Sequence, residues 1–504
     1  MITFVIGLAI LVAGLIFYGR FCERVFHPDD RVTPAIAKED NVDFVPMKQW
    51  KNSLVNLLNI AGTGPILGPI QGILFGPIAF ITIPLGCVLG GAMHDYFAGM
   101  ICEREGGIQM PELIRKYTGK GVSLLYTIFV SLLLLLVGTV FIYTPGDIAA
   151  TQLFRSGGTS TDATTWFIYL LIFIYYLIAT VLPIDKIIGR IYPIFGAILI
   201  LSAVGIFITI FAKGYPLIEL WQPWVLNGFD FGSYFREGHF IPIFFITVAC
   251  GILSGFHATQ TSLISRTMAK EKEGRMTFYD MMIVEGFIAM VWAAASMAMI
   301  GYGAAHSGID VKFSQGVWQY YQMNEGVLEA ISPTSVVGVI CKNALGHIGG
   351  NIAILGVIIL PITSGDTALR SLRLIFAETL GIKQDSNIKR LGLAVPIFLA
   401  VYGLLVYAKL SPDGFNNLWR YMGWANQTIA IFALAVIMIW MMGHGRKKYI
   451  WMPAIPLAFY SLIVSSYILG ASIGFHLPWP VSYTGGVLFS VIIIVCTFLK
   501  GNKS

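Results

Sequence analysis

Long apolar segments separated by short polar ones run through the chain from end to end. An α-helix needs about 20 apolar residues to cross a bilayer core of roughly 30 Å, and this criterion predicts thirteen membrane-spanning helices. They cover residues 2–19, 53–74, 77–101, 121–145, 165–183, 188–213, 239–260, 278–302, 350–375, 391–409, 415–441, 449–470 and 480–499. The alternating segments of about ten residues that are typical of a transmembrane β-barrel are absent. The pattern predicts an all-α integral membrane protein.

Positive charge is distributed unevenly among the loops between these segments. Most of the 33 lysines and arginines fall in alternate loops, and such residues are retained on the cytoplasmic side of a membrane. We therefore expect the N-terminus outside the cell and the C-terminus in the cytoplasm. The net charge of +6 follows from these inner loops and does not indicate nucleic-acid binding.

Composition supports the membrane assignment and excludes some functions. The 504 residues are 56% hydrophobic and 12% charged, with a mean hydropathy of +0.75, far from the balance of a soluble domain. Six cysteines are scattered without C-x-x-C spacing, so we expect small core residues and not metal ligands or disulfides. No phosphate-binding G-x-x-x-x-G-K-[ST] loop is present, so we expect no coupling to ATP by this chain.

The second predicted span contains residues that interrupt a helix. In NIAGTGPILGP (59–69), Pro65 cannot continue a helix but suits the first turn of a new one. We expect the chain to unwind over 61–64 and to restart at Pro65. Unpaired backbone groups at membrane depth are tolerated only beside protein or a polar cavity. Glycines that recur every fourth residue from Gly64 to Gly76 also predict a smooth face for close helix packing.

A second interruption is predicted in ACGILSGFHATQTS (249–262), at Gly251, Ser254 and Gly255. The first interrupted span begins inside and this one begins outside, with four spans between them. The chain then divides into two five-helix units of opposite orientation, each opening with a discontinuous helix. Inverted-repeat secondary transporters place their binding site between two such helices, near the bilayer midplane.

This arrangement leaves one extra helix at the N-terminus and two at the C-terminus. The predicted domains are residues 1–52, with the first helix and a cytoplasmic loop, and 53–213, the first repeat. Residues 214–441 form the second repeat with an extracellular insertion at 303–349, and 442–504 form two helices and a tail. The insertion contains a helix-like stretch, SPTSVVGVICKNALGHIGG, which could form a lid.

Six stretches carry a resemblance to a known family. They are NIAGTGPILGP (59–69), GAMHDYFAGM (91–100), PIDKIIGRIYPIFG (183–196), CGILSGFHATQTS (250–262), PITSGDTALRSLRLIF (361–376) and LWRYMGWANQTIA (418–430). In these the chain resembles the carbon starvation protein A family of bacterial inner-membrane transporters. The resemblance implies a fold like that of the amino acid, polyamine and organocation transporters. It also implies import of small peptides during carbon starvation or, in some members, of pyruvate.

The two breaks predict a substrate site. Free N–H groups and the positive dipole at the start of each restarted helix suit an anion such as a carboxylate, while the preceding helix ends expose carbonyls that suit a cation or an ammonium. The predicted substrate-binding residues are Ala61, Gly62, Thr63, Gly64, Pro65, Gly251, Ser254, Gly255, Phe256, His257 and Asn426. For Phe256 the alternative is core packing, and for Asn426 it is a hydrogen bond to a neighbouring helix.

Ionisable residues within the spans are candidates for ion coupling, because a charge in the bilayer is costly. His94, Asp95, His257, Glu285 and Asp366 share a similar depth. They could form a proton relay, or His94 and Asp95 could bond neighbouring helices while Asp366 pairs with Arg370. A divalent metal at His94, Asp95 and His257 is a third alternative, although no H-x-x-x-H spacing supports it.

The resemblance adds a sodium alternative. In sodium-coupled relatives of this fold, hydroxyls placed like those of Thr363 and Ser364 join carbonyls of the first break to bind Na⁺. The predicted coupling residues are therefore His94, Asp95, Glu285, Thr363, Ser364 and Asp366. We expect no cofactor besides a coupling ion, H⁺ or Na⁺.

Together these observations predict an ion-coupled importer of small peptides that works by alternating access. A pyruvate symporter and a transporter-like nutrient sensor are the alternatives. An ion channel would need a continuous polar path, whereas the polar residues here cluster at one depth, and no enzyme activity is expected. The expected partners are a peptide or pyruvate and the lipid bilayer of the bacterial cytoplasmic membrane, with an accessory subunit or an oligomer left open.

Overall fold

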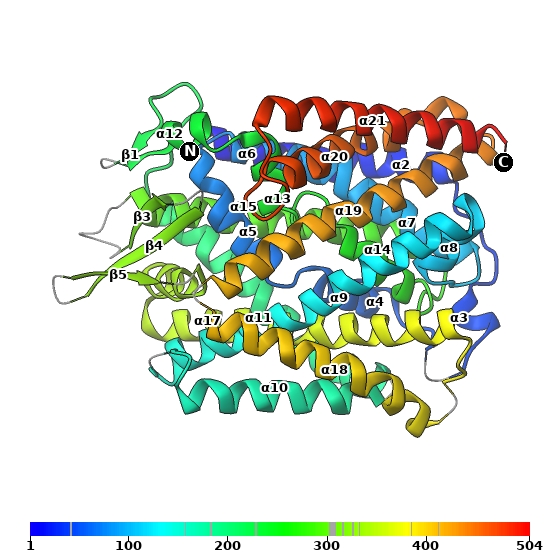
Figure 1. Cartoon of the computed structure of the whole chain (residues 1–504), viewed down its shortest axis with the longest axis horizontal. Helices are drawn as coiled ribbons and strands as arrows, with labels where there is room; N and C mark the ends of the chain where they lie inside the picture. The colour runs from blue at the N-terminus through cyan, green and yellow to red at the C-terminus, as the bar shows by residue number, and fades with distance from the viewer. Residues whose placement is uncertain are drawn as a thin grey trace.

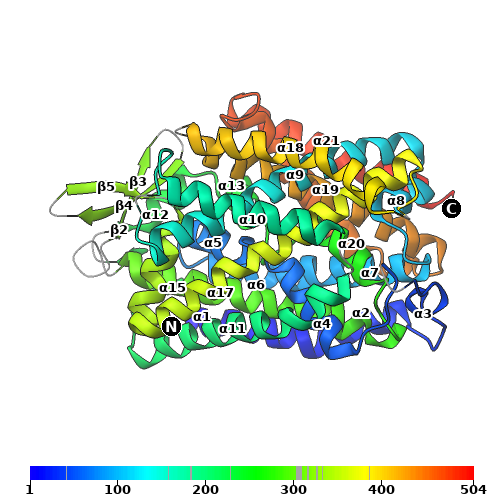
Figure 2. The same ribbon diagram turned by 90° about the horizontal axis from the view of Figure 1, so that it is seen from below.

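Most helices of the chain run along the long axis of the molecule (Figures 1 and 2). The computed structural model describes residues 1–40, 43–156, 158–181, 184–226, 229–301, 309–314, 317–324, 327–331, 333–384, 386–411 and 413–503. Side chains are not described over 181–193, which include most of the PIDKIIGRIYPIFG stretch. A small sheet lies at one end of the axis, called the strand end, and α8 (Met110–Thr118) lies at the other, called the α8 end.

Helices dominate the described part of the chain, and their bounds follow the apolar segments closely. The N-terminal half contains α1 (Ile2–Ala13), α2 (Gly19–Phe26), α3 (Pro34–Ala37), α4 (Gln49–Ile60), α5 (Gly64–Gly72), α6 (Ala79–Gly86), α7 (Met93–Arg104), α9 (Lys120–Ile148), α10 (Ala163–Val181) and α11 (Ile184–Ala212). The C-terminal half contains α12 (Phe231–Glu237), α13 (Phe240–Thr247), α14 (Gly255–Ile264), α15 (Met281–Gly301), α17 (Pro333–Leu380), α18 (Asn387–Leu410), α19 (Gly414–Gly443), α20 (Trp451–Gly470) and α21 (Trp479–Gly501).

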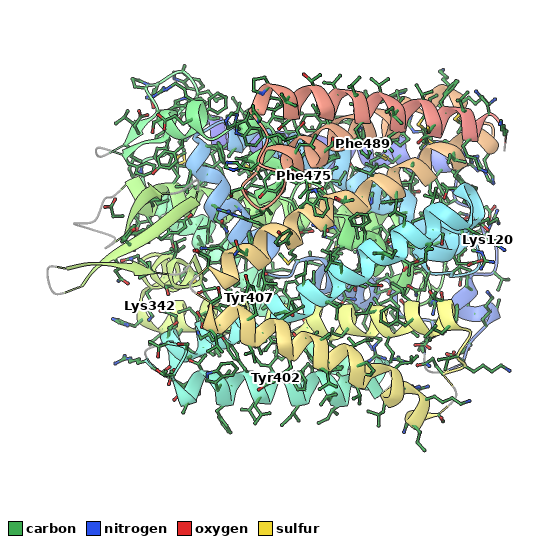
Figure 3. All side chains as sticks on the ribbon, viewed as in Figure 1. Lys120, Lys342, Tyr402, Tyr407, Phe475 and Phe489 are labelled. Carbon is green, nitrogen blue, oxygen red and sulfur yellow. The ribbon has the colours of Figure 1, made fainter. Side chains whose placement is uncertain are left out.

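Eleven helical segments of the described chain are long and apolar enough to cross a membrane, and the bent pair α4–α5 makes a twelfth. The remaining predicted span, 239–260, corresponds to α13 and α14, which are each short and are separated by residues 248–254. Figure 3 shows the aromatic side chains of Tyr402 and Phe489 on the flanks of the molecule, whereas Lys342 and Lys120 lie at its two ends. Apolar flanks between charged ends are what a bilayer requires.

The insertion between α15 and α17 contains a sheet that the hydropathy pattern does not predict. Strands β3 (Ile309–Ser314), β4 (Val317–Asn324) and β5 (Val327–Ile331) pair antiparallel in the order β3-β4-β5. A second antiparallel pair, β1 (Val225–Leu226) and β2 (Phe229–Asp230), precedes α12. From Pro333 onward the helix-like stretch forms the start of α17, which kinks at Gly346, where φ is +69°. Residues 303–308 of the insertion lie outside the described residues.

A buried ion pair joins α9 to α18 near the strand end. Lys409 Nζ lies 2.6 Å from Asp147 Oδ1 and also donates to the carbonyl of Gly158 at 2.7 Å. The hydroxyl of Tyr169 on α10 donates to the same carboxylate oxygen at 3.2 Å. The pair therefore ties three helices together, and neither charge is left without a partner.

Removal of one member of this pair should destabilise the protein strongly. Lys409→Met leaves Asp147 charged and buried, which should lower the free energy of unfolding by about 3–5 kcal/mol. The double variant Lys409→Met/Asp147→Leu should recover most of that loss, because a buried pair replaced by apolar side chains is often neutral. Unfolding curves of the purified protein in detergent measure both. A single variant as stable as the wild type would contradict this account.

Candidate functional site

The first break lies between α4 and α5, which are bent by 48° relative to each other. Helical backbone ends at Ile60 and resumes at Gly64, and Pro65 stands in the first turn of α5. Residues Ala61, Gly62 and Thr63 between them are buried. The predicted unwinding is confirmed over 61–63, and the helix restarts at Gly64, one residue before the predicted Pro65. Proline therefore lies in the first turn, where its missing N–H costs nothing.

The second break separates α13 from α14 by the seven residues 248–254. Gly251 has φ +91°, a conformation that residues with a side chain rarely adopt. Ser254 is in extended backbone at the N-cap of α14, and Gly255 begins that helix. The interruption predicted at these three residues is confirmed.

The two breaks lie against each other. A Cβ on Gly64 would come within 2.2 Å of both Cβ and Sγ of Cys250, and one on Gly68 would come within 2.9 Å of the carbonyl oxygen of Thr247. A Cβ on Gly72 would meet the side chain of Val248. The glycine face predicted on α5 is thus the surface that receives the second break, and only hydrogen at these positions permits the contact.

Side chains from two long helices supply the hydrogen bonds that the broken backbone lacks. Asn426 Oδ1 on α19 accepts from the backbone N–H of Phe256 at 2.7 Å, and Gln427 Nε2 donates to the carbonyl of Leu253 at 2.8 Å. At the first break, Ser364 Oγ on α17 donates to the carbonyl of Leu58 at 2.8 Å. The amide of Asn426 therefore bonds a neighbouring helix, which was its alternative role.

An aromatic pair closes over the first break. The rings of Phe141 on α9 and Phe256 on α14 lie 6.4 Å apart in a perpendicular arrangement, and a Cβ on Gly62 would strike Phe141. Phe256 is buried. It thus packs against α9 next to the residues that were predicted to bind substrate.

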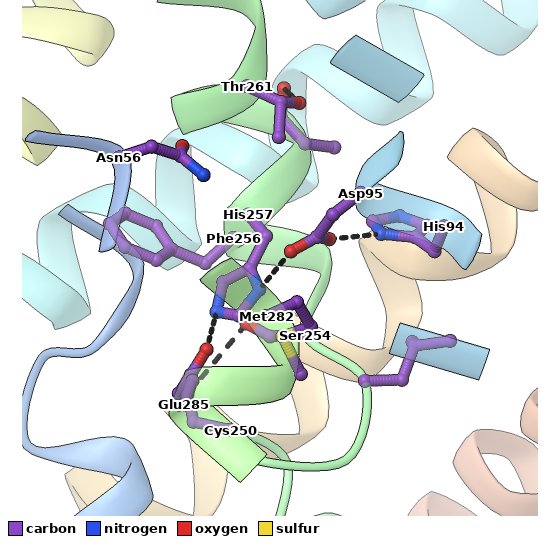
Figure 4. Close-up of polar contacts among 12 residues, drawn as sticks. Asn56, His94, Asp95, Cys250, Ser254, Phe256, His257, Thr261, Met282 and Glu285 are labelled. Atoms are coloured by element: carbon purple, nitrogen blue, oxygen red, sulfur yellow. Dashed lines mark hydrogen bonds and ion pairs between the residues drawn. The ribbon is translucent and has the colours of Figure 1, made fainter. Parts of the chain in front are cut away.

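A chain of four ionisable side chains runs beside the second break (Figure 4). Asp95 Oδ1 lies 2.8 Å from His94 Nδ1, and Asp95 Oδ2 lies 2.8 Å from His257 Nδ1. The other ring nitrogen of His257, Nε2, lies 3.5 Å from Glu285 Oε2. All four side chains have 0% exposure. The group has two carboxylates and two imidazoles, so it can carry protons or hold a cation.

Local backbone features place these side chains. A π-helical segment, Cys87–Ala92, precedes His94 and Asp95 at the start of α7, and such segments often occur at functional sites. His257 lies in the first turn of α14 because the helix restarts only at Gly255. Glu285 lies near the start of α15 and faces the same point. The position of the second break therefore determines the direction of the His257 side chain.

The remaining coupling candidates lie elsewhere. Asp366 Oδ1 is 3.8 Å from Arg370 Nη2, one turn along α17, as the pairing alternative predicted. Thr363 Oγ1 donates to the carbonyl of Leu360 within the same helix, and Ser364 reaches the first break. The structure thus joins His94, Asp95, His257 and Glu285 into one group and assigns Asp366 to another.

Sequence reasoning missed Cys250. Its Sγ, a nitrogen of His257 and an oxygen of Glu285 all lie within 4.8 Å of one another. The cysteine was interpreted as a core residue because the six cysteines are scattered without C-x-x-C spacing. The break at 248–254 folds the interval between Cys250 and His257 back, and the proximity of the cysteine to a predicted break was the one available signal.

Comparison with known proteins identifies the family. The model of the family described as carbon starvation protein CstA matches residues 1–144, 139–315 and 326–466. The chain belongs to the carbon starvation protein CstA family. The CstA-family protein named peptide transporter CstA in Mycobacterium tuberculosis (strain H37Rv) is 26% identical over 88% of this chain and 72% of its own. The Escherichia coli protein of that name is 24% identical, over 88% and 77%. An uncharacterized membrane protein of Haemophilus influenzae is 40% identical over 59% of this chain and 91% of its own.

Solved structures show the fold of this CstA-family chain. It is similar to a mutant manganese transporter of Eremococcus coleocola, with a TM-score of 0.59 and 13% identity over 90% of this chain and 94% of that one. MhsT in complex with L-phenylalanine gives a TM-score of 0.54 at 14% identity, over 90% and 99%. The chain is an all-α membrane transporter with discontinuous helices.

Loss of the Asn426 amide should weaken the second break. In Asn426→Leu the backbone N–H of Phe256 loses its acceptor while it stays buried, which should cost about 1–3 kcal/mol. Thr428→Val is the matched control, because among the described residues Thr428 bonds the carbonyl of Trp424, one turn back in its own helix, and not the broken segment. Thermal unfolding in detergent compares the two, and equal stability would show that the amide does not support the break.

Proposed function

We propose that this chain imports small peptides across the cytoplasmic membrane by alternating access, driven by an inward gradient of H⁺ or Na⁺. The observation that carries the proposal is the contact between the two breaks at Gly64 and Cys250. A transporter that binds its substrate between two discontinuous helices needs them side by side near the midplane. Relatives named peptide transporters cover 88% of the chain, which supports peptides as the substrate class.

A peptide suits the chemistry of the breaks. The helices α5 and α14 begin here, and the positive ends of their dipoles favour a carboxylate; α4 and α13 end here, and the negative ends of their dipoles favour an ammonium. A zwitterionic peptide carries both groups. Pyruvate has a carboxylate but no ammonium, so the ends of α4 and α13 favour a peptide as the substrate.

Alternating access requires contacts that close the site and then separate. At the α8 end, Arg266 Nη2, just beyond α14, lies 3.0 Å from Glu378 Oε1 near the end of α17, and Arg266 Nε donates to the carbonyl of Gly107 at 2.7 Å. Because this pair joins the second discontinuous helix to a long neighbouring helix, it would have to part before the breaks could open toward the predicted cytoplasm.

The coupling ion has a candidate position at the first break. The hydroxyl of Ser364 on α17 bonds the carbonyl of Leu58 near the end of α4, and hydroxyl and carbonyl oxygens suit a hard cation such as Na⁺. The carboxylate and imidazole groups beside the second break offer the alternative position, for H⁺. These two arrangements support coupling to a cation. The uptake assay described next distinguishes H⁺ from Na⁺.

Uptake by proteoliposomes tests the proposed function. Purified protein is reconstituted, and accumulation of a labelled dipeptide and of labelled pyruvate is measured under a proton gradient and, separately, a sodium gradient. We expect the dipeptide to accumulate under one of the two gradients, and we expect this accumulation to stop when that gradient is collapsed. Accumulation of pyruvate but not of the dipeptide would show that the substrate is a monocarboxylate and not a peptide. Specific binding of dipeptide without accumulation under either gradient would favour the sensor.

The contact between the breaks predicts the effect of one substitution. Gly64→Leu places a branched side chain where Cys250 stands, so uptake should fall to background while the protein stays folded in the membrane. Gly64→Ala, with its single added carbon, should be impaired less. The matched control is Gly403→Leu, because Gly403 is exposed on α18 and a Cβ there meets nothing within 4 Å. Wild-type uptake by Gly64→Leu would show that this contact is not the site.

A further inference from the structure

Three donor atoms from three parts of the fold converge beside the second break. Cys250 lies on the break itself, His257 in the first turn of α14 and Glu285 on α15. One ligand atom from each lies within 4.8 Å of the other two. Figure 4 shows the three side chains turned toward one another. Nothing in the transport proposal requires the thiol at this point.

The surrounding groups prepare His257 as a ligand. Asp95 Oδ2 bonds its Nδ1 at 2.8 Å, so the free Nε2 is the nitrogen directed at Glu285 and the thiol. A carboxylate that holds one ring nitrogen of a histidine while the other binds an ion is the usual outer shell of a metal site. His94 in turn bonds the other oxygen of Asp95, which fixes the carboxylate.

In the part of the chain that the structure describes, Glu285 and the Nε2 atom of His257, which face the centre, make no hydrogen bond of ordinary length and angle. Within the described residues, neither oxygen of Glu285 has a hydrogen-bond partner, and His257 Nε2 has none either, at 3.5 Å from the carboxylate. Both side chains are fully buried. Because an unpaired polar group in a membrane interior costs several kcal/mol, the arrangement is incomplete as protein alone.

A metal ion would complete it after a modest movement of the side chains. Bonds from Zn²⁺ to nitrogen, oxygen and sulfur are about 2.0–2.3 Å long, so two donors of a tetrahedral site lie about 3.3–3.8 Å apart. The present separations are at most 4.8 Å, so the donors would have to approach one another by about 1.5 Å or less. When the Cys250 thiol releases its proton to solvent on binding, its thiolate and the Glu285 carboxylate together balance the charge of a divalent ion.

We propose that Cys250, His257 and Glu285 form a binding site for a soft divalent cation of the Zn²⁺ class. Thiolate and imidazole ligands select zinc and similar ions over Mg²⁺ and Ca²⁺. Three protein ligands leave one coordination position for water or another ligand. The ion joins the break to α14 and α15, so it holds the second discontinuity in the geometry seen here. Cys250, which is incompletely buried and faces Gly64, connects this site to the space between the breaks.

Metal binding by the purified, full-length protein tests this site without any transport assay. The protein in detergent is stripped with a chelator and titrated with ZnCl₂ against a chromophoric competitor. We expect about one tightly bound Zn²⁺ per chain. Asp95→Asn, which removes the outer-shell carboxylate charge, should weaken binding about 10–100-fold, and Cys250→Ser and Glu285→Gln should weaken it further. Cys341→Ser is the control, because Cys341 is buried on α17 and outside this group.

Cobalt provides a direct signature of the thiol. Co²⁺ added to the stripped wild type should give a sulfur-to-cobalt charge-transfer band in the near ultraviolet, retained in Cys341→Ser and absent from Cys250→Ser. Gel filtration of each variant without metal checks its fold. Absence of zinc binding or of the sulfur band in the wild type would overturn the proposal, and so would unchanged zinc affinity in folded Cys250→Ser and Glu285→Gln. A negative uptake assay would leave these results intact.

Discussion

A backbone that unwinds inside a bilayer must find its hydrogen-bond partners within the protein, because lipid offers none. This requirement governs the centre of the molecule. Gln427 and Asn426 reach from α19 to the second break, and Ser364 reaches from α17 to the first. The helix α19 and the part of α17 that follows its kink at Gly346 are long. They form a frame that holds the two broken segments at membrane depth.

The same breaks explain why ionisable groups gather there. Unwinding shortens α14 so that His257 lies in its first turn, beside Asp95 from α7 and Glu285 from α15. Glycine at position 64 then admits Cys250 from the other break. The unwinding of the second break therefore accounts for both the buried group of ionisable side chains and the tight contact between the helices. Any ligand between the breaks lies within reach of that group.

Much of this could be predicted from the sequence, because its signals are local. Apolar length located the spans, and Pro65 and Gly251 marked the two breaks. The depth of a residue in the membrane could also be predicted from its position along a span, which is why Asp366 was grouped with His257. Depth is only one coordinate, however. Rotation about each helix axis depends on packing, and packing turns Asp366 toward Arg370 and away from the histidine. For the same reason the thiol of Cys250 could not be linked with Glu285, since they meet only through tertiary contact.

A substrate held between the two breaks would cover Cys250, so the reactivity of this thiol reports whether the site is occupied. In a variant that keeps Cys250 and has serine at the other five cysteines, freed of metal by a chelator, the rate of alkylation by a small maleimide is measured in proteoliposomes. The account predicts that a transported dipeptide slows this reaction in proportion to its occupancy, while a compound that is not transported leaves it unchanged. An alkylation rate unaffected by dipeptide at concentrations that saturate uptake would contradict the account.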